Sequence, residues 1–190
     1  DGFSCKVNDF AKDSVNIYGS GTIENTNAYE RGLVHVQDLA SQLCCKAVDP
    51  QAGDTVLDIC SAPGGKAFTM AELMEDKGKV YAFDLHENRV KLIRNGAKRL
   101  GLKCIEANTN NGKVFNENMP MADKVLCDVP CSGLGVIRRK PEIKYKNPED
   151  FENLPNIQYE ILDTSSKYVK DGGVLVYSTC TLSKAENNEI

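Results

Sequence analysis

Two cysteines, Cys131 and Cys180, directly follow apolar, β-rich segments of the chain. Cys131 belongs to the sequence Asp128-Val-Pro-Cys-Ser-Gly, and Cys180 follows Tyr-Ser-Thr. Structural cysteines more usually lie within a strand, whereas the carboxyl ends of parallel strands border the crevice in which ligands bind. A thiolate is a strong nucleophile when a neighbouring cation lowers its pKa, and Lys66 could supply that charge. The positions favour a chemical role for both thiols, with structural thiols and a solvent-facing Lys66 as the alternative.

A loop of small residues follows the first apolar segment, at the expected start of a helix. It comprises Cys60, Ser61, Ala62, Pro63, Gly64, Gly65 and Lys66. Glycines let a backbone approach a ligand closely, and the free N–H groups of a helix start favour a carboxylate or a phosphate. The loop is not a P-loop, because Ala67 stands where Ser or Thr would hold magnesium, and it lacks the GxGxxG dinucleotide pattern. A tight turn with an acidic helix cap is the structural alternative to a binding loop.

Asp84 stands nineteen residues after Gly65, at the end of the second predicted strand. An acid at this position takes ribose hydroxyls in nucleoside-binding sheets. A loop for a carboxylate and an acid for a ribose together fit S-adenosylmethionine. Two thiols, a carboxyl group and this cofactor suit methylation at C5 of cytosine: a thiolate adds to C6, C5 takes the methyl group, and loss of the C5 proton and of the thiol restores the ring. A methyltransferase is therefore favoured over a nicotinamide oxidoreductase.

Short β-rich segments alternate with helix-length amphipathic segments from Val56 onward, which is typical of βα units around a parallel sheet. The predicted strands are residues 55–60, 79–84, 103–107, 123–128 and 174–179, and the predicted helices are residues 36–48, 65–75, 86–100 and 150–170. Lys167 and Lys170, followed by Gly172-Gly173, mark the end of the last helix. Residues 1–34 are expected to form an irregular or hairpin lead-in segment, and residues 35–190 the methyltransferase domain. The pattern predicts an α/β protein with a doubly wound, Rossmann-like sheet.

The composition is that of a single globular unit of 190 residues, 41% hydrophobic and 26% charged. A net charge of −4 excludes a protein whose whole surface attracts polyanions, so a nucleic-acid partner needs a local basic patch. Eight cysteines without a CxxC pair, accompanied by two histidines, predict free thiols and no metal site. The absence of a secretory signal and of a membrane-length apolar run predicts a cytoplasmic protein. The sequence stops shortly after the last predicted strand, and we expect a fragment.

The required basic patch lies directly after the Pro-Cys loop. Residues 138–146 carry one acid and five cations: Arg138, Arg139, Lys140, Lys144 and Lys146. These cations could meet the phosphates of an RNA, and Tyr145 could stack on a base, while the target cytosine is unstacked into the crevice. A merely solvated basic loop is the alternative. Gln37 and Asp38, in the first predicted helix, are further candidates for lining the crevice.

Taken together, these motifs resemble the Sun/Fmu family of RNA 5-methylcytosine methyltransferases. The resemblance runs from residue 32 to residue 190 and includes the Cys60–Lys66 loop, residues 128–139 and Ser178-Thr-Cys180. It implies S-adenosylmethionine as the cofactor, bound by the Cys60–Lys66 loop, Asp84 and Asp128. It also implies an RNA substrate, with 16S ribosomal RNA favoured and transfer RNA as the alternative.

The resemblance implies roles for individual side chains as well. Cys180 would be the nucleophile, Cys131 would assist product release, and Asp128 would hold the target base beside Lys66. In DNA cytosine methyltransferases the Pro-Cys thiol is the nucleophile, so a reaction begun by Cys131 is the mechanistic rival. Asn110 stands where the family usually has an Asp near the adenine, which puts cofactor affinity in question. We expect the family's amino-terminal RNA-binding domain and last carboxyl-terminal stretch to be absent, and a non-catalytic RNA-binding or assembly module is the alternative function.

Overall fold

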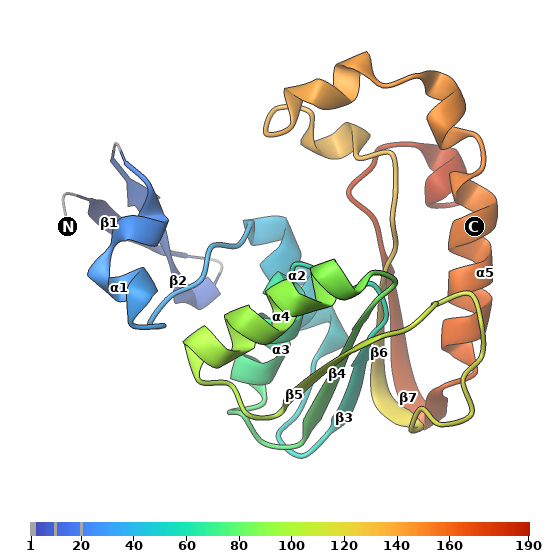
Figure 1. The fold of residues 1–190 in the computed structure, drawn as a ribbon, viewed down its shortest axis with the longest axis horizontal. Helices are drawn as coiled ribbons and strands as arrows, with labels where there is room; N and C mark the ends of the chain where they lie inside the picture. Colours follow the sequence, from blue (N-terminus) through green and yellow to red (C-terminus); the bar gives the residue numbers. More distant parts are fainter. Residues whose placement is uncertain (1–2, 10, 20) are drawn as a thin grey trace.

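The computed structural model describes residues 3–9, 11–19 and 21–190 (Figure 1). Its main element is a parallel sheet of five strands in the order β5-β4-β3-β6-β7. The strands are β3 (Thr55–Asp58), β4 (Lys79–Asp84), β5 (Ile105–Thr109), β6 (Ala122–Asp128) and β7 (Val169–Ser178). The longer helices are α2 (Leu39–Val48), α3 (Gly65–Leu73), α4 (Glu87–Leu100) and α5 (Leu154–Ser166). This order confirms the predicted doubly wound α/β sheet.

Helices cover both faces of the sheet and form two apolar cores. On one face, α2, α3 and α4 pack in a cluster that includes Val56 and Ile93. On the other face, α5 packs in a cluster that includes Leu57 and Ile161. Neighbouring residues of β3 thus enter different cores, which is why its two central residues, Val56 and Leu57, are both apolar. The covered sheet is a rigid support for the loops at its carboxyl edge.

The segment before the sheet contains a β-hairpin, which is one of the two forms predicted for residues 1–34. Its strands β1 (Ser4–Asn8) and β2 (Ala11–Tyr18) are antiparallel, and the short helices η1 (Ile23–Asn25) and α1 (Asn27–Glu30) follow. The Arg99 guanidinium of α4 holds this segment, because it donates to the backbone oxygens of Tyr29 (2.7 Å) and Val34 (3.0 Å) and lies 3.7 Å from the centre of the Tyr29 ring. Residues 1, 2, 10 and 20 of the predicted segment lie outside the described residues.

The last helix is shorter than predicted. It ends at Ser166, and Gly172-Gly173, expected to terminate it, lie inside β7 where the pairing with β6 shifts register. Such an irregularity is a β-bulge, which accommodates the positive φ of Gly172. The ammonium of Lys170 lies 2.9 Å from both carboxylate oxygens of Asp123, so its charge holds the start of β6 and does not cap a helix.

The third predicted strand lies two residues further along the chain. Because β5 begins at Ile105, Cys104 precedes the strand and does not lie within it, although its side chain is buried. A carboxylate oxygen of Asp76 accepts hydrogen bonds from the backbone N–H groups of Lys103 and Cys104, both at 2.8 Å. These bonds hold the two residues in the connection that leads into the strand.

All eight cysteines are free thiols in the structure. Within residues 3–9, 11–19 and 21–190, no group of three or more acidic, histidine or cysteine side chains could hold a metal ion. None of the described helices is long and apolar enough to cross a membrane.

Candidate active site

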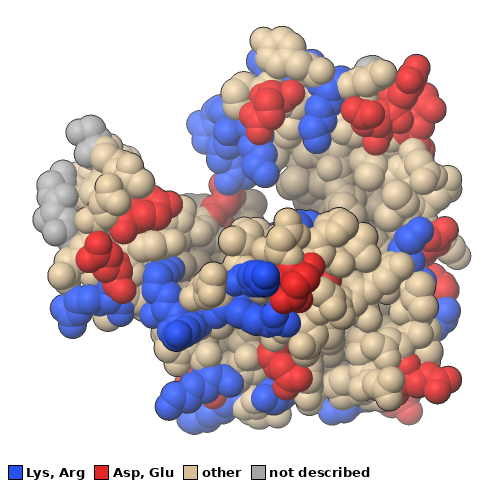
Figure 2. Space-filling view, in the orientation of Figure 1, with Lys and Arg blue, Asp and Glu red and all other residues tan. Residues whose placement is uncertain are grey.

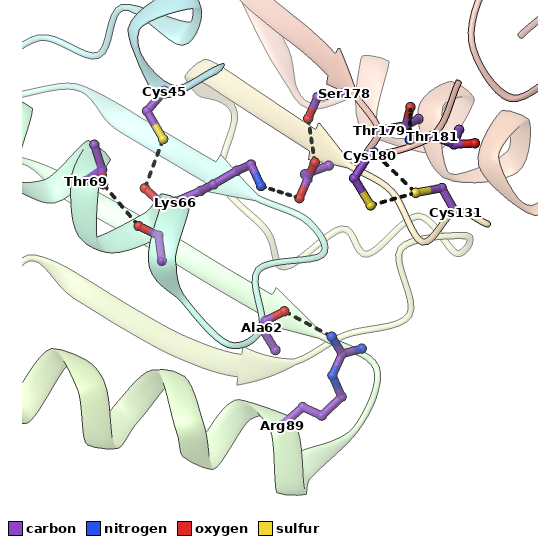
Figure 3. A network of polar contacts seen from close by, with 12 residues as sticks. Cys45, Ala62, Lys66, Thr69, Arg89, Cys131, Ser178, Thr179, Cys180 and Thr181 are labelled. Carbon is purple, nitrogen blue, oxygen red and sulfur yellow. Dashed lines mark hydrogen bonds and ion pairs between the residues drawn. The ribbon is translucent and has the colours of Figure 1, made fainter. Parts of the chain in front are cut away.

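The predicted catalytic residues meet at the carboxyl ends of three neighbouring strands, β3, β6 and β7. The sheet order changes direction at β3: α3 leads from β3 to β4 on one side, whereas β6 lies on the other side. Ligands bind at such a switch point in α/β sheets. Figure 3 shows Lys66, Cys131, Ser178 and Cys180 at this edge, with Arg89 reaching the loop after β3.

Cys131 and Cys180 face each other, although they follow different strands. Their sulfur atoms lie 3.2 Å apart, and the backbone N–H of Cys180 donates to Sγ of Cys131 at 3.3 Å. The hydrogen bond from the Cys131 thiol lowers the pKa of Cys180 to about 6, and the charge of Lys140 adds to this effect. The same hydrogen bond, together with burial, raises the pKa of Cys131. These opposite shifts make the exposed Cys180 the more acidic thiol of the pair, while Cys131 retains its proton more readily.

Asp128, at the end of β6, joins the loop after β3 to the end of β7. Its Oδ2 lies 2.7 Å from Nζ of Lys66, and its Oδ1 accepts a hydrogen bond from Oγ of Ser178 at 2.7 Å. Burial alone would lower the pKa of Lys66, but the charge and the hydrogen bond of Asp128 raise it above its ordinary value. Lys66 is therefore a fixed cation. This contact of Ser178 could not be predicted from the sequence, because only the pairing of β6 with β7 brings its hydroxyl to Asp128.

The loop after β3 is held close to the start of α3. Gly64 has a φ of +108°, and a Cβ atom there would lie 2.5 Å from the ring of Phe68. The backbone oxygen of Ala62 accepts a hydrogen bond from Arg89 at 3.0 Å, which ties the loop to α4. Cys60 packs against the core on the α5 side, and burial raises its pKa. A ligand at this loop would meet the backbone of Cys60, since the thiol belongs to the core.

The two residues predicted to contact the nucleoside lie side by side. Asp84, at the end of β4, is 3% exposed, and its carboxylate accepts from the backbone N–H of His86 (3.2 Å) and pairs with Arg89 (3.2 Å). The backbone N–H of Asn110 donates to the backbone oxygen of Asp84 at 3.0 Å. The amide oxygen of Asn110 accepts from Asn116 at 3.4 Å. Both residues thus stand at the same sheet edge as the loop.

Two buried polar side chains lie beside this loop: Ser61, which was predicted to bind the cofactor, and Asp58, which was missed from the sequence. In the part of the chain that the structure describes, both carboxylate oxygens of Asp58 and the hydroxyl of Ser61 lack a hydrogen-bond partner. Burial raises the pKa of Asp58 to about 7. Unpartnered buried polar atoms are rare, and a polar ligand at the loop would satisfy them, so these residues fit S-adenosylmethionine. The signal in the sequence was an acid that ends an otherwise apolar strand.

The five predicted RNA-binding cations lie on an arm of residues 134–151, which contains η2 (Leu134–Val136), η3 (Pro141–Tyr145) and η4 (Pro148–Phe151). All five are exposed, and Figure 2 shows Lys and Arg side chains gathered where this arm faces the hollow above the sheet. Arg139 is paired with Asp38 at the start of α2, and Lys146 lies 5.9 Å from the centre of the Phe151 ring. The side chain of Ile143 is buried against Gly133 of the Pro-Cys loop. The fit is close, since a Cβ atom added to Gly133 would lie 3.0 Å from Cδ1 of Ile143. The arm is thus anchored on the Pro-Cys loop.

Gln37, the other residue predicted to line the crevice, accepts a hydrogen bond from the hydroxyl of Thr69 in α3 at 2.6 Å.

The chain is similar to known proteins along its whole length. The family model described as 16S rRNA methyltransferase RsmB/F matches residues 45–190. The probable ribosomal RNA small subunit methyltransferase B of Bacillus subtilis (strain 168) is 46% identical over 193 residues, covering 100% of this chain and 43% of that protein. The crystal structure of PH0851 is 34% identical with a TM-score of 0.94, covering 100% of this chain and 43% of that one.

The crystal structure of NSun6 from Pyrococcus horikoshii with SFG is 33% identical with a TM-score of 0.82, covering 90% of this chain and 44% of that one. The chain therefore spans less than half the length of the relatives it matches. Their fold is that of Rossmann-like, S-adenosylmethionine-dependent methyltransferases, which confirms the predicted fold class and the cofactor that goes with it.

Proposed function

Because the chain belongs to the RsmB/F family of 16S rRNA methyltransferases, we propose that it is the catalytic part of an enzyme that methylates C5 of a cytosine in 16S ribosomal RNA. Membership itself supports an RNA methyltransferase, acting in the cytoplasm. The finer assignment rests on one observation, the 3.2 Å contact between the sulfurs of Cys131 and Cys180 beside Asp128. This arrangement provides one thiolate that can add to a ring and one thiol that can exchange a proton.

Cys180 begins the proposed reaction. Its thiolate adds to C6 of the cytosine, which breaks the C5–C6 double bond and makes C5 enamine-like. S-adenosylmethionine would supply the electrophilic methyl group that C5 takes, and its sulfur would leave as the thioether S-adenosylhomocysteine. Asp128, fixed by Lys66 and Ser178, would contact the N3 and N4 edge of the base and stabilise the adduct.

Cys131 is suited to the release step. In the free protein its pKa is raised by the contact with Cys180 and by burial, so it keeps its proton. Once the sulfur of Cys180 is bonded to carbon, it no longer carries a negative charge, and Cys131 becomes easier to deprotonate. The Cys131 thiol then gives its proton to solvent, its thiolate takes the C5 proton, and the electron pair of that C–H bond reforms the C5–C6 double bond and expels Cys180 as a thiolate.

The cofactor would be held by the loop of residues 60–66 and by the two strand ends beside it. Backbone N–H groups at the start of α3 would bind the carboxylate of its methionine part. Asp84 would bind the ribose and Asn110 the adenine, each through oxygen atoms that accept hydrogen bonds. Asp58 and Ser61 have no hydrogen-bond partner among the described protein residues, and polar groups of the cofactor would supply one. The presence of SFG, an analogue of S-adenosylmethionine, in the NSun6 relative supports S-adenosylmethionine as the cofactor.

The RNA would approach over the arm of residues 134–151. Its exposed cations suit phosphate contacts, and Tyr145, 88% exposed, suits stacking on an unpaired base. Arg139 contributes less in this proposal, because Asp38 already neutralises its charge.

Trapping of the covalent adduct tests the proposal. We expect the Cys131→Ala variant, incubated with 16S rRNA and S-adenosylmethionine, to accumulate a protein–RNA band on a denaturing gel, because addition can occur but release is blocked. The Cys180→Ala variant should form no such band. A parallel reaction with transfer RNA in place of 16S rRNA compares the two substrate classes, and we expect the band with 16S rRNA. An adduct that persists in the Cys131→Ala, Cys180→Ala double variant would overturn the assignment of the nucleophile.

A further inference from the structure

A buried carboxylate with no step in the proposed reaction lies behind the thiol pair. Glu186 belongs to η5 (Lys184–Glu186) and is 3% exposed. Its Oε2 accepts hydrogen bonds from the backbone N–H of Ser132 at 2.8 Å and from Nε2 of Gln158 at 3.0 Å. Its Oε1 accepts from the hydroxyls of Ser132 at 2.5 Å and Thr181 at 3.4 Å. One carboxylate thus gathers donors from the Pro-Cys loop, from α5 and from the loop after β7.

These donors directly adjoin the two cysteines. Ser132 follows Cys131 and Thr181 follows Cys180, and the two hydroxyls lie 2.7 Å apart. Nε2 of Gln158 also donates to the backbone oxygen of the residue that precedes Cys131, at 2.9 Å. The carboxylate and this amide therefore hold the chain on both sides of Cys131 and immediately after Cys180.

The carboxyl group of Glu186 is ionised in this network. Burial opposes the charge, but hydrogen bonds from Ser132, Gln158 and Thr181 outweigh it and hold the pKa of Glu186 below its ordinary value. Hydrogen bonds to an ionised group are stronger than those between neutral groups, and losing them leaves buried donors unsatisfied. The network thus favours one arrangement of the two loops over others.

We propose that Glu186 is a positioning residue, whose carboxylate holds the Cys131 loop against the Cys180 loop and keeps the two sulfurs within hydrogen-bond distance. The catalytic meaning of this role rests on the proposed function, but the positioning is a property of the free protein. Without Glu186, the contact between the hydroxyls of Ser132 and Thr181 would still join the loops. We therefore expect a loosened thiol pair and not an unfolded site.

The test follows the ionisation of Cys180, which a merely stabilising residue would not change. The rate of alkylation by iodoacetamide is measured against pH by mass spectrometry of the tryptic peptide 171–184, in which Cys180 is the only cysteine. Glu186→Ala should shift the midpoint of this profile to higher pH and reduce the rate at pH 7 by about threefold to tenfold, since the thiolate fraction falls. Asp128, Lys140 and Lys66, which also act on Cys180, are left in place.

Two matched variants isolate the role of the carboxylate. Glu186→Gln can offer its carbonyl oxygen to the two N–H donors and its NH₂ group to the two hydroxyls, so it should keep most of the wild-type rate. Glu189→Ala removes an exposed acid three residues further along the same segment and should leave the profile unchanged. Should Glu186→Ala fail to fold, as judged by circular dichroism, Gln158→Leu removes one donor of the same network and should shift the midpoint in the same direction by less.

A double-variant cycle shows whether Glu186 acts through Cys131. In a Cys131→Ala background the second substitution, Glu186→Ala, should cause no further shift, because the donor it positions is already gone. An unchanged profile for Glu186→Ala, or an equal shift in both backgrounds, would overturn the proposal. Because alkylation needs no RNA, failure of the wild-type protein to form an RNA adduct would reject the proposed function while leaving this result to stand on its own.

Discussion

Replacing Cys131 by alanine removes the hydrogen-bond donor that contributes most to the low pKa of Cys180. The wild-type value is about 6, against an ordinary value of 9.0. After the substitution, the charges of Lys140 and Lys66 still favour the thiolate, while burial and Asp128 oppose it. We therefore expect the pKa of Cys180 to rise towards its ordinary value.

The size of the effect follows from the thiolate fraction. At pH 7 that fraction is about nine-tenths for a pKa of about 6 and about one-hundredth for a pKa of 9. Because Cys180 is exposed, solvent screens part of the interaction, and we expect the alkylation rate at pH 7 to fall by about tenfold or more. The adduct of Cys131→Ala with RNA should accordingly form slowly at pH 7 and faster at pH 9, while still accumulating.

The assay measures alkylation at peptide 171–184 from about pH 5 to about pH 10, a range that spans both the wild-type pKa of Cys180 and its ordinary value of 9.0. Cys104→Ala, which removes a buried thiol directly before β5, serves as the control and should reproduce the wild-type profile. A midpoint that stays near 6 in Cys131→Ala would refute the reasoning. The low pKa would then have to come from Lys140 and Lys66.

Three further outcomes follow from the same structure. Asp84→Ala should weaken S-adenosylmethionine binding by about tenfold to a hundredfold, the usual cost of losing hydrogen bonds to a charged group, as measured by calorimetry. Gly64→Ala should lower the free energy of unfolding in urea by about 2–3 kcal/mol, because it combines a strained φ with a clash, whereas Gly101→Ala, with a φ of +74° and nothing within 4 Å, should cost about 1 kcal/mol. Lys140→Ala combined with Lys144→Ala should reduce RNA affinity, measured by filter binding. The slope of log K against log salt concentration should become less negative by about 1.4, since two phosphate contacts are lost at about 0.7 each for single-stranded RNA.

The sequence by itself determined the succession of elements and the positions of the reactive groups along the chain. Apolar runs too short to be helices, separated by amphipathic segments, indicate buried parallel strands, because both faces of such strands are covered. Residues directly after those runs, such as Asp128 and Cys180, then stand at the carboxyl edge whatever the order of the strands. The ends of two elements differ from the prediction, namely the end of the last helix and the start of the third strand. In each case a contact with a distant part of the chain, made by Lys170 or by Asp76, holds the residues there in another conformation.

Only the tertiary structure decided which of these groups touch. The pairing of β6 with β7 brings Cys131 to 3.2 Å from Cys180 and so gives the two thiols different pKa values, which no spacing along the chain predicts. Burial below the loop left Asp58 without a described partner, and the fold of the carboxyl-terminal segment placed Glu186 between the two loops. Hydrogen bonds act over about 3 Å, so they depend on packing between segments that the sequence presents far apart.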